Sequence, residues 1–336
     1  MKDHEFAKLY HDTWNKAKQN IKKCYFPGCN EQPINSHILQ KNGILNQIAT
    51  NNHIWEYKIN QFKKEPFYFD KTGINEIYSF DCFCKEHDDK LFEKIEKKQI
   101  NFNDYESCLL FTLRTIYNEI WRKEINIEQY KLMMKSKYSS EINLEFLLGR
   151  IQQELLGIDD LRNNEEDIWE DYNNKTQNFV FQVRELNKID ICLSAFYNYE
   201  TTLEMYNYKK LNGKDMPRIS EVFINIFPYN NKTLLLMGYN KKDEKKLKPY
   251  VNTFFKESEN KVQKKITNLL MFACETWVIS EKLYKDKIEK IKDIFIACIN
   301  HAIIINNERE FFNVNLFKDN YFNEMQKIKR HLVSIK

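Results

Sequence analysis

Four candidate metal ligands occur as two close pairs in the first third of the chain. Cys24 and Cys29 are separated by four residues, and Cys84 and His87 by two. Pro27-Gly28 supplies a turn signal inside the first pair. A structural zinc site takes four Cys or His ligands from two such pairs, because each short spacing lets both side chains converge on one ion. The sequence therefore predicts a zinc site, and zinc binding would contribute directly to the folding of this segment.

The other cysteines need separate interpretations. Cys82 competes with Cys84, because residues two apart in a strand share a face, but the two-residue gap to His87 favours Cys84. Four cysteines are isolated in apolar surroundings and are predicted to be buried small hydrophobic residues. They are Cys108, Cys192, Cys274 and Cys298.

The compartment is predicted from what the sequence does not contain. The amino-terminal residues have no apolar segment of the signal-peptide kind, and no stretch approaches the roughly 18–20 apolar residues that cross a bilayer. We therefore expect a cytoplasmic protein without a membrane partner, whose cysteines are thiols or metal ligands rather than disulfides.

Length and periodicity predict two domains. A chain of 336 residues is long enough for about two domains. Residues 1–100 are expected to form a small zinc module, with a helix over 5–22, strands at Ile34–Leu39 and Ser79–Cys84, extended segments at 53–59 and 67–69, and a helix from Asp88. Residues 101–336 are expected to form a mainly helical body with a small antiparallel sheet, so the fold class is α+β.

The elements of the body follow from its hydrophobic spacing. Helices are predicted over 104–136, 140–158, 243–256, 258–284 and 286–305, and strands over 190–199, 219–229 and 233–239. Asn230-Asn231-Lys232 suits a hairpin turn between the last two strands. The acidic segment 163–174 is expected to be an exposed turn or a helix end.

Residues 20–98 resemble a known family of nucleases. A Cys pair, the strand residues Ser36-His37, a loop with Gly73, and a helix start in the sequence FCKEHDDKLF are similar to the treble-clef, ββα-metal module of the HNH group. The resemblance implies structural zinc on Cys24, Cys29, Cys84 and His87. It also implies that His37 is the general base that activates water, and that Asp88 holds a catalytic Mg²⁺ or Mn²⁺.

The chain departs from the family pattern at three points. Ser36 stands where an acid or His is usual, and Asp88 stands where His or Asn is usual. The spacing between strand and helix is about twice that of the family, so residues 44–80 are expected to be an insertion. His37 could alternatively have a structural role or replace a zinc ligand, and Asp88 could simply stabilise the start of a helix.

Composition limits how the protein could bind nucleic acid. The 52 basic and 48 acidic residues leave a net charge of only +4, and 44 of the basic residues are Lys. Contact with a polyanion must therefore come from local patches. The lysine pairs near the predicted zinc module are the candidates for phosphate contact, namely Lys22-Lys23, Lys63-Lys64 and Lys97-Lys98.

Two functions are compatible with the sequence. The first is a metal-dependent HNH-type endonuclease that hydrolyses phosphodiester bonds in nucleic acid, with DNA as the first candidate, in the setting of bacterial anti-phage defence. Its body would serve as a sensor, partner-binding or oligomerisation domain. The second is a non-catalytic zinc module that binds nucleic acid or a protein partner.

Overall fold

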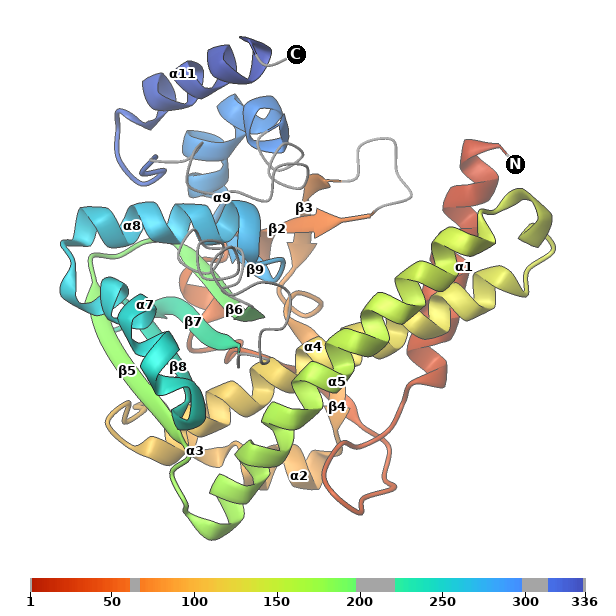
Figure 1. Ribbon diagram of the computed structural model, residues 1–336, viewed down its shortest axis with the longest axis horizontal. Helices are drawn as coiled ribbons and strands as arrows, with labels where there is room; N and C mark the ends of the chain where they lie inside the picture. Colours follow the sequence, from red (N-terminus) through yellow and green to blue (C-terminus); the bar gives the residue numbers. More distant parts are fainter. Residues whose placement is uncertain (1, 61–66, 198–220, 298–313, 335–336) are drawn as a thin grey trace. The chain divides into compact units, whose positions relative to one another are not determined.

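The chain forms two compact units. The structure, a computed structural model, describes residues 2–60, 67–197, 221–297 and 314–334 (Figure 1). The first unit comprises Met1–Ile38 and Tyr78–Thr176, and the second comprises Leu39–Ile77 and Gln177–Lys336. This grouping differs from the predicted division at residue 100, because the long helices after that residue share a unit with the Cys/His pattern. The segment that leaves the first unit, 39–77, lies close to the insertion expected at 44–80.

A two-stranded sheet and a short helix form the centre of the first unit. Strands β1 (Ile34–His37) and β4 (Ser79–Phe83) lie within the two strand segments predicted from sequence, and they pair antiparallel. Helix α2 (Lys85–Leu91) follows β4 directly and begins three residues before the expected start at Asp88. A single turn of helix, α3 (Glu93–Glu96), comes next. The order β1, β4, α2 is the strand–strand–helix order that the resemblance to ββα-metal modules implies.

Three long helices complete the first unit (Figure 1). Helix α4 (Tyr105–Met134) packs along α5 (Leu144–Asn174), and α1 (Asp3–Asn20) packs on α4. The helix predicted at 140–158 is too short, because α5 continues through the acidic segment to Asn174. Ile168 and Trp169 are buried in this continuation, so packing holds the helix together past Gly157.

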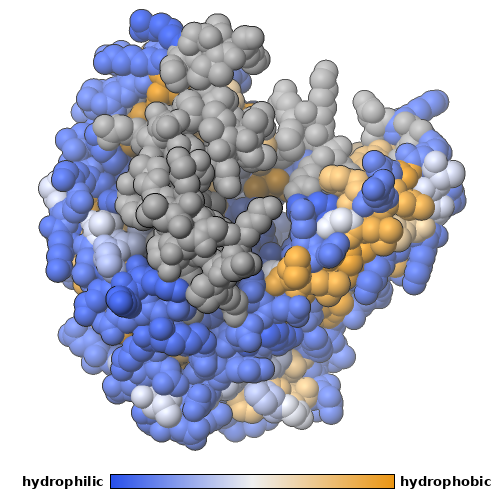
Figure 2. Space-filling view, viewed as in Figure 1, coloured by the Kyte–Doolittle hydropathy of each residue, from blue (hydrophilic) through white to orange (hydrophobic). Residues whose placement is uncertain are grey.

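Helix α5 also presents an apolar stripe to solvent. Leu144, Leu148 and Leu155 are all more than two-fifths exposed and recur at intervals of four and seven residues. This spacing places them on one side of the helix. Phe146 and Leu156 add further exposed apolar surface, which Figure 2 shows in orange along the helix.

The second unit is built on one antiparallel sheet. Its order is β3-β2-β9-β6-β7-β8-β5. The strands are β2 (His53–Ile59), β3 (Phe67–Gly73), β5 (Phe179–Leu186), β6 (Ile191–Tyr197), β7 (Val222–Tyr229), β8 (Lys232–Asn240) and β9 (Trp277–Ile279). The helices are α7 (Glu244–Lys256), α8 (Glu259–Asn268), α9 (Glu281–Leu283) and α11 (Tyr321–Ser334). The fold class is α+β, as predicted.

The sheet is larger than the small sheet predicted for the body. The extended segments near residues 53–59 and 67–69 join it as β2 and β3 instead of staying in the zinc module. The predicted hairpin between β7 and β8 is confirmed, with Asn230 and Asn231 both in the left-handed region that such two-residue turns require. The single helix predicted at 258–284 is wrong, because α8 ends at Asn268, a π-helical segment covers Leu269–Ala273, and strand β9 follows. The helix predicted at 286–305 lies partly outside the described residues.

Helices α7 and α8 belong to the same hydrophobic core as the sheet. Leu247 and Phe254 of α7 and Val262 of α8 are buried together with strand residues such as Ile224 and Met237. Among the described residues, no helix is both long enough and apolar enough to cross a membrane.

Candidate metal centre

The first ligand pair lies on a tight turn before β1. The backbone N–H of Cys29 donates to the carbonyl of Phe26 at 3.0 Å, and Gly28 has a φ of +77°. Glycine adopts this left-handed conformation without steric cost. The N–H of Tyr25 donates to the Cys82 carbonyl at 2.8 Å, which ties the turn to β4. The turn therefore aims both thiols toward the end of β4.

The second pair lies where β4 becomes α2. Cys84 precedes the first residue of α2, and its carbonyl accepts from the N–H of Asp88 at 2.9 Å. This first helical turn brings His87 back beside Cys84. The backbone N–H of Cys84 also points at the Cys24 sulfur, at 3.3 Å. Such N–H to sulfur contacts stabilise the negative charge of thiolate ligands at metal sites.

All four predicted ligands converge. The sulfurs of Cys24, Cys29 and Cys84 and a ring nitrogen of His87 lie within 4.8 Å of one another. Nδ1 of His87 is 3.2 Å from the Cys84 sulfur and 3.5 Å from the Cys24 sulfur. Zinc bonds of about 2.3 Å to sulfur and 2.0–2.1 Å to nitrogen place tetrahedral S and N ligands about 3.6 Å apart. The donor chemistry and the spacing therefore fit a zinc ion.

The surroundings of the cluster suit a closed, structural metal site. Cys24 and Cys84 are buried, and burial raises the pKa of the Cys24 thiol to about 11. A metal ion must displace that proton, because the thiolate is the ligand form. The Phe26 ring stacks on the His87 ring with centroids 3.8 Å apart and planes within 4°, which fixes the imidazole with Nδ1 toward the sulfurs.

Cys82 lies elsewhere. It is fully buried, and its thiol faces the Tyr117 carbonyl of α4 at 3.5 Å instead of joining the cluster. Burial raises the pKa of this thiol well above its usual value. The structure thus brings Cys84 rather than Cys82 to the other three candidates. The isolated Cys108, Cys192 and Cys274 are buried as free thiols, as predicted, while Cys298 lies outside the described residues.

The two predicted catalytic residues lie on the elements that the cluster joins. His37 is the last residue of β1 and pairs with Ser79 of β4, and its side chain is half-buried. Asp88 lies in the first turn of α2, directly after His87. The buried Ser36 side chain lies near Asp88. The described residues offer no hydrogen-bond partner to Ser36 Oγ or to Oδ1 of Asp88.

An arginine that the sequence analysis missed lies next to Asp88. Arg114 of α4 is only 2% exposed, and its Nη2 is 3.8 Å from Oδ1 of Asp88. Its Nη1 forms an ion pair with Glu96, and its guanidinium lies over the Phe92 ring at 4.2 Å. Burial raises the pKa of Asp88, and the guanidinium opposes part of that rise. The sequence did contain a signal for this contact, because Arg114 lies within an apolar stretch of a predicted helix. A buried guanidinium requires carboxylate partners.

The oxygen ligands beside Asp88 are few. One carboxylate and the Ser36 hydroxyl fall short of the six oxygen ligands that Mg²⁺ requires. A divalent cation here would depend on water and on phosphate oxygens of a substrate, as Mg²⁺ does in many phosphoryl-transfer sites. It would also compete with Arg114 for the same carboxylate oxygen.

A hydrogen-bonded network braces the first ligand pair against α4 and α5. The Tyr117 hydroxyl donates to Glu165 and accepts from Nε1 of Trp169 at 2.6 Å. The Trp169 ring meets Phe26 edge-on, with centroids 5.4 Å apart. The Tyr25 hydroxyl donates to Glu124 of α4 at 2.6 Å. The cluster is therefore supported by helices that lie beyond residue 100.

The predicted phosphate-binding lysines are only partly available. Lys23 forms an ion pair with Glu124, and Lys97 with Glu93, while Lys63 and Lys64 lie outside the described residues.

Comparisons with models of protein families, with curated proteins and with solved structures find no match.

Proposed function

We propose that the protein is a metal-dependent endonuclease of HNH type, acting on phosphodiester bonds of nucleic acid, with DNA as the first candidate. The observation that supports this proposal most is the convergence of Cys24 and Cys29, from the loop before β1, with Cys84 and His87, from the junction of β4 and α2. A zinc ion held there would fix the positions of the elements that carry His37 and Asp88. The resemblance to HNH modules assigns chemistry to those same two residues.

In this proposal the chain's residues divide the work between structure and chemistry. The Cys/His cluster holds zinc for stability. A neutral His37 imidazole accepts a proton from the attacking water. Asp88 would hold Mg²⁺ or Mn²⁺, which would stabilise the negative charge that develops in the transition state. The resemblance also motivates a role in anti-phage defence as part of the same proposal.

One observation favours a second candidate function. Arg114 already neutralises part of the charge on Asp88, and the ion pair places a positive group where a cation would bind. In that arrangement Asp88 stabilises the module instead of binding metal. The second candidate is therefore a non-catalytic zinc module that binds nucleic acid or a protein partner, including a second copy of the chain.

A cleavage assay separates the two candidates. We expect zinc-loaded wild-type protein to nick supercoiled plasmid with Mg²⁺ or Mn²⁺. His37→Ala should slow the reaction by about 10²–10⁴-fold, because a general base contributes that much. His53→Ala is the matched control, since His53 is an exposed histidine at the start of β2 and should cut like the wild type. The same assay is repeated with an RNA substrate. If wild type, His37→Ala and His53→Ala all carry zinc and all leave plasmid and RNA intact, the result favours the non-catalytic module.

A further inference from the structure

The two compact units carry opposite net charge. The unit with the Cys/His cluster has 20 basic and 25 acidic residues, a net charge of −5. The unit with the large sheet has 32 basic and 23 acidic residues, a net charge of +9. The small net charge of the whole chain conceals this asymmetry. A polyanion would therefore be attracted to the sheet unit and repelled by the other.

Much of the positive excess comes from one short segment of the sheet unit. Residues 241–265 contain nine Lys, four acidic residues and no Arg, a net charge of +5. They include α7, α8 and the turn before α7. More than half of the excess positive charge of the unit thus lies within 25 residues.

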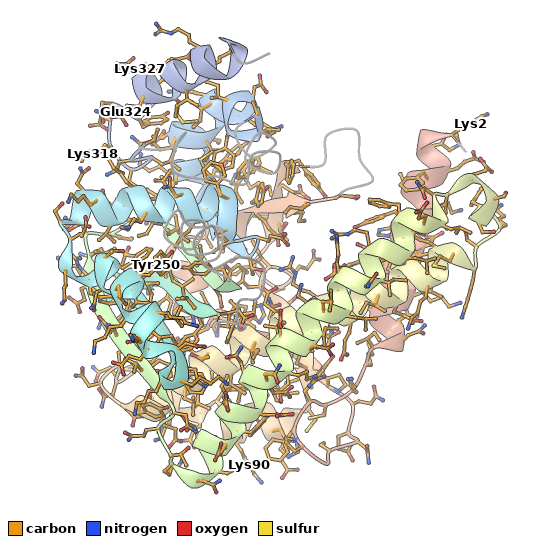
Figure 3. All side chains as sticks on the ribbon, in the orientation of Figure 1. Lys2, Lys90, Tyr250, Lys318, Glu324 and Lys327 are labelled. Atoms are coloured by element: carbon orange, nitrogen blue, oxygen red, sulfur yellow. The ribbon has the colours of Figure 1, made fainter. Side chains whose placement is uncertain are left out.

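The packing of α7 forces its lysines outward. Leu247, Val251 and Phe254 are buried, as is Tyr250, which is labelled in Figure 3. Lysines at 245, 248 and 256 follow one another after three and eight residues, which keeps them on the opposite side of the helix. All three are exposed, as is the lysine at 241 in the preceding turn. We call these four residues, Lys241, Lys245, Lys248 and Lys256, the lysine stripe.

Three members of the lysine stripe have charges available for a ligand. Lys248 forms an ion pair with Glu244 at 2.7 Å. Lys241, Lys245 and Lys256 have no carboxylate partner within the described parts of the chain. The helical part of the stripe, from Lys245 to Lys256, spans roughly 16 Å. Duplex DNA carries one negative charge per about 1.7 Å of its axis, so several phosphates fall within this length.

We propose that the lysine stripe is the docking surface for the phosphodiester backbone of nucleic acid. This choice of polyanion rests on the proposed function. Lysine ammonium groups contact phosphate as point charges and do not read base edges in the bidentate way that arginine does. Docking through the stripe is therefore insensitive to sequence and strongly dependent on salt. It supplies affinity from a unit that does not contain the cluster.

The test measures binding of a labelled DNA duplex by fluorescence anisotropy over roughly 50–200 mM KCl. The variant K241Q/K245Q/K256Q removes the three free charges. Its affinity should fall on the order of 100-fold, and the slope of log K against log salt should become shallower by about 0.9 per lost contact. The matched control is K8Q/K16Q/K135Q, which removes three exposed lysines of the acidic unit and should bind within about twofold of the wild type. Circular dichroism verifies that both variants are folded.

The outcomes separate this surface from the nuclease chemistry. Unchanged affinity in the stripe variant, equal losses in both variants, or wild-type binding to anionic lipid vesicles but not to the duplex would each overturn the docking surface. Wild-type protein that binds through the stripe but never cuts leaves the surface standing and refutes the nuclease. If the wild type cleaves nucleic acid and the stripe variant binds the duplex as tightly as the wild type, the nuclease proposal stands and the docking surface is refuted.

Discussion

At the scale of single residues, two cysteines two positions apart have different surroundings. Cys84 lies at the end of β4 beside the sulfur of Cys24, whereas Cys82 points to the backbone of α4. Both are buried, so burial alone does not distinguish them. The difference comes from the strand end, because Cys84 has already left the pleat to begin α2. The two positions therefore provide a matched pair for testing the zinc assignment.

We expect Cys84→Ala to lose zinc and Cys82→Ala to retain it. Wild-type protein should carry about one zinc ion per chain after dialysis, as measured by inductively coupled plasma mass spectrometry. Cys84→Ala should fall close to zero and lose stability, because the free energy of structural zinc binding is folding free energy. Cys82→Ala removes a thiol of similar burial without removing a ligand. Equal zinc contents in the two variants would refute the ligand set.

The candidate ligands that the sequence singled out come together where their spacing along the chain is local. The Cys24/Cys29 and Cys84/His87 pairs each converge through one turn, and such turns follow from short spacing. Arg114 could not be assigned in this way. Its contact with Asp88 depends on which helix packs against α2, and that is a tertiary property. The same limit applies to the Phe26 and Trp169 rings beside the cluster.

At the scale of helices and strands, local sequence pattern predicted that an element exists better than it predicted where the element begins and ends. The turn residues Asn230 and Asn231 specify their hairpin by their own conformational preference. Strand β9 is three residues long and lies between helical segments, so its partners in β2 and β6 define it more than its sequence does. Helix α5 passes a glycine and an acidic run because its buried side packs on α4.

We expect substitution of glycine by alanine to have opposite effects on stability at Gly238 and at Gly149. A Cβ on Gly238 of β8 would lie 2.1 Å from the Phe223 ring and 2.7 Å from the Val180 carbonyl oxygen. Gly238→Ala should therefore lower the free energy of unfolding by about 1–3 kcal/mol, the usual cost of overpacking. A Cβ on Gly149 of α5 would meet no other side chain or element of the described chain within 4 Å. Gly149→Ala should raise stability by about 1 kcal/mol, because alanine is the better helix former.

Urea unfolding followed by circular dichroism measures both glycine variants against the wild type. The comparison controls for the chemistry of the change, since each variant adds one methyl group. Destabilisation by Gly149→Ala, or no effect of Gly238→Ala, would contradict the packing described for these two elements.

At the scale of the whole molecule, the chain order interleaves the two units. The chain leaves the first unit after Ile38, returns at Tyr78, and leaves again after Thr176. The division that periodicity predicts at residue 100 could not find this insertion, because the inserted segment has strand patterns of its own and these resemble a continuation of the zinc module. The partners of β2 and β3 lie within the sheet of the second unit, where β2 pairs with β9, more than 200 residues along the chain.

The geometry at the insertion point predicts that the first unit can be isolated. The N–H of Ile38 donates to the Tyr78 carbonyl at 2.9 Å, and His37 pairs with Ser79. The two ends of the insertion are thus already neighbours in an antiparallel ladder. A two-residue Asn-Gly turn can close such a ladder. Residues 39–77 should therefore be replaceable by Asn-Gly without moving the Cys/His cluster.

We expect the shortened chain, residues 1–38 joined by Asn-Gly to 78–176, to fold and bind about one zinc ion. It retains all four ligands and the Tyr117–Trp169 brace on α4 and α5. Residues 1–100 also contain every ligand but lack both helices, so they should remain unfolded even with zinc. Zinc analysis and urea unfolding measure both fragments. A folded 1–100 fragment beside an unfolded shortened chain would contradict the division into units, because the ligands would then need the inserted segment and not the helices.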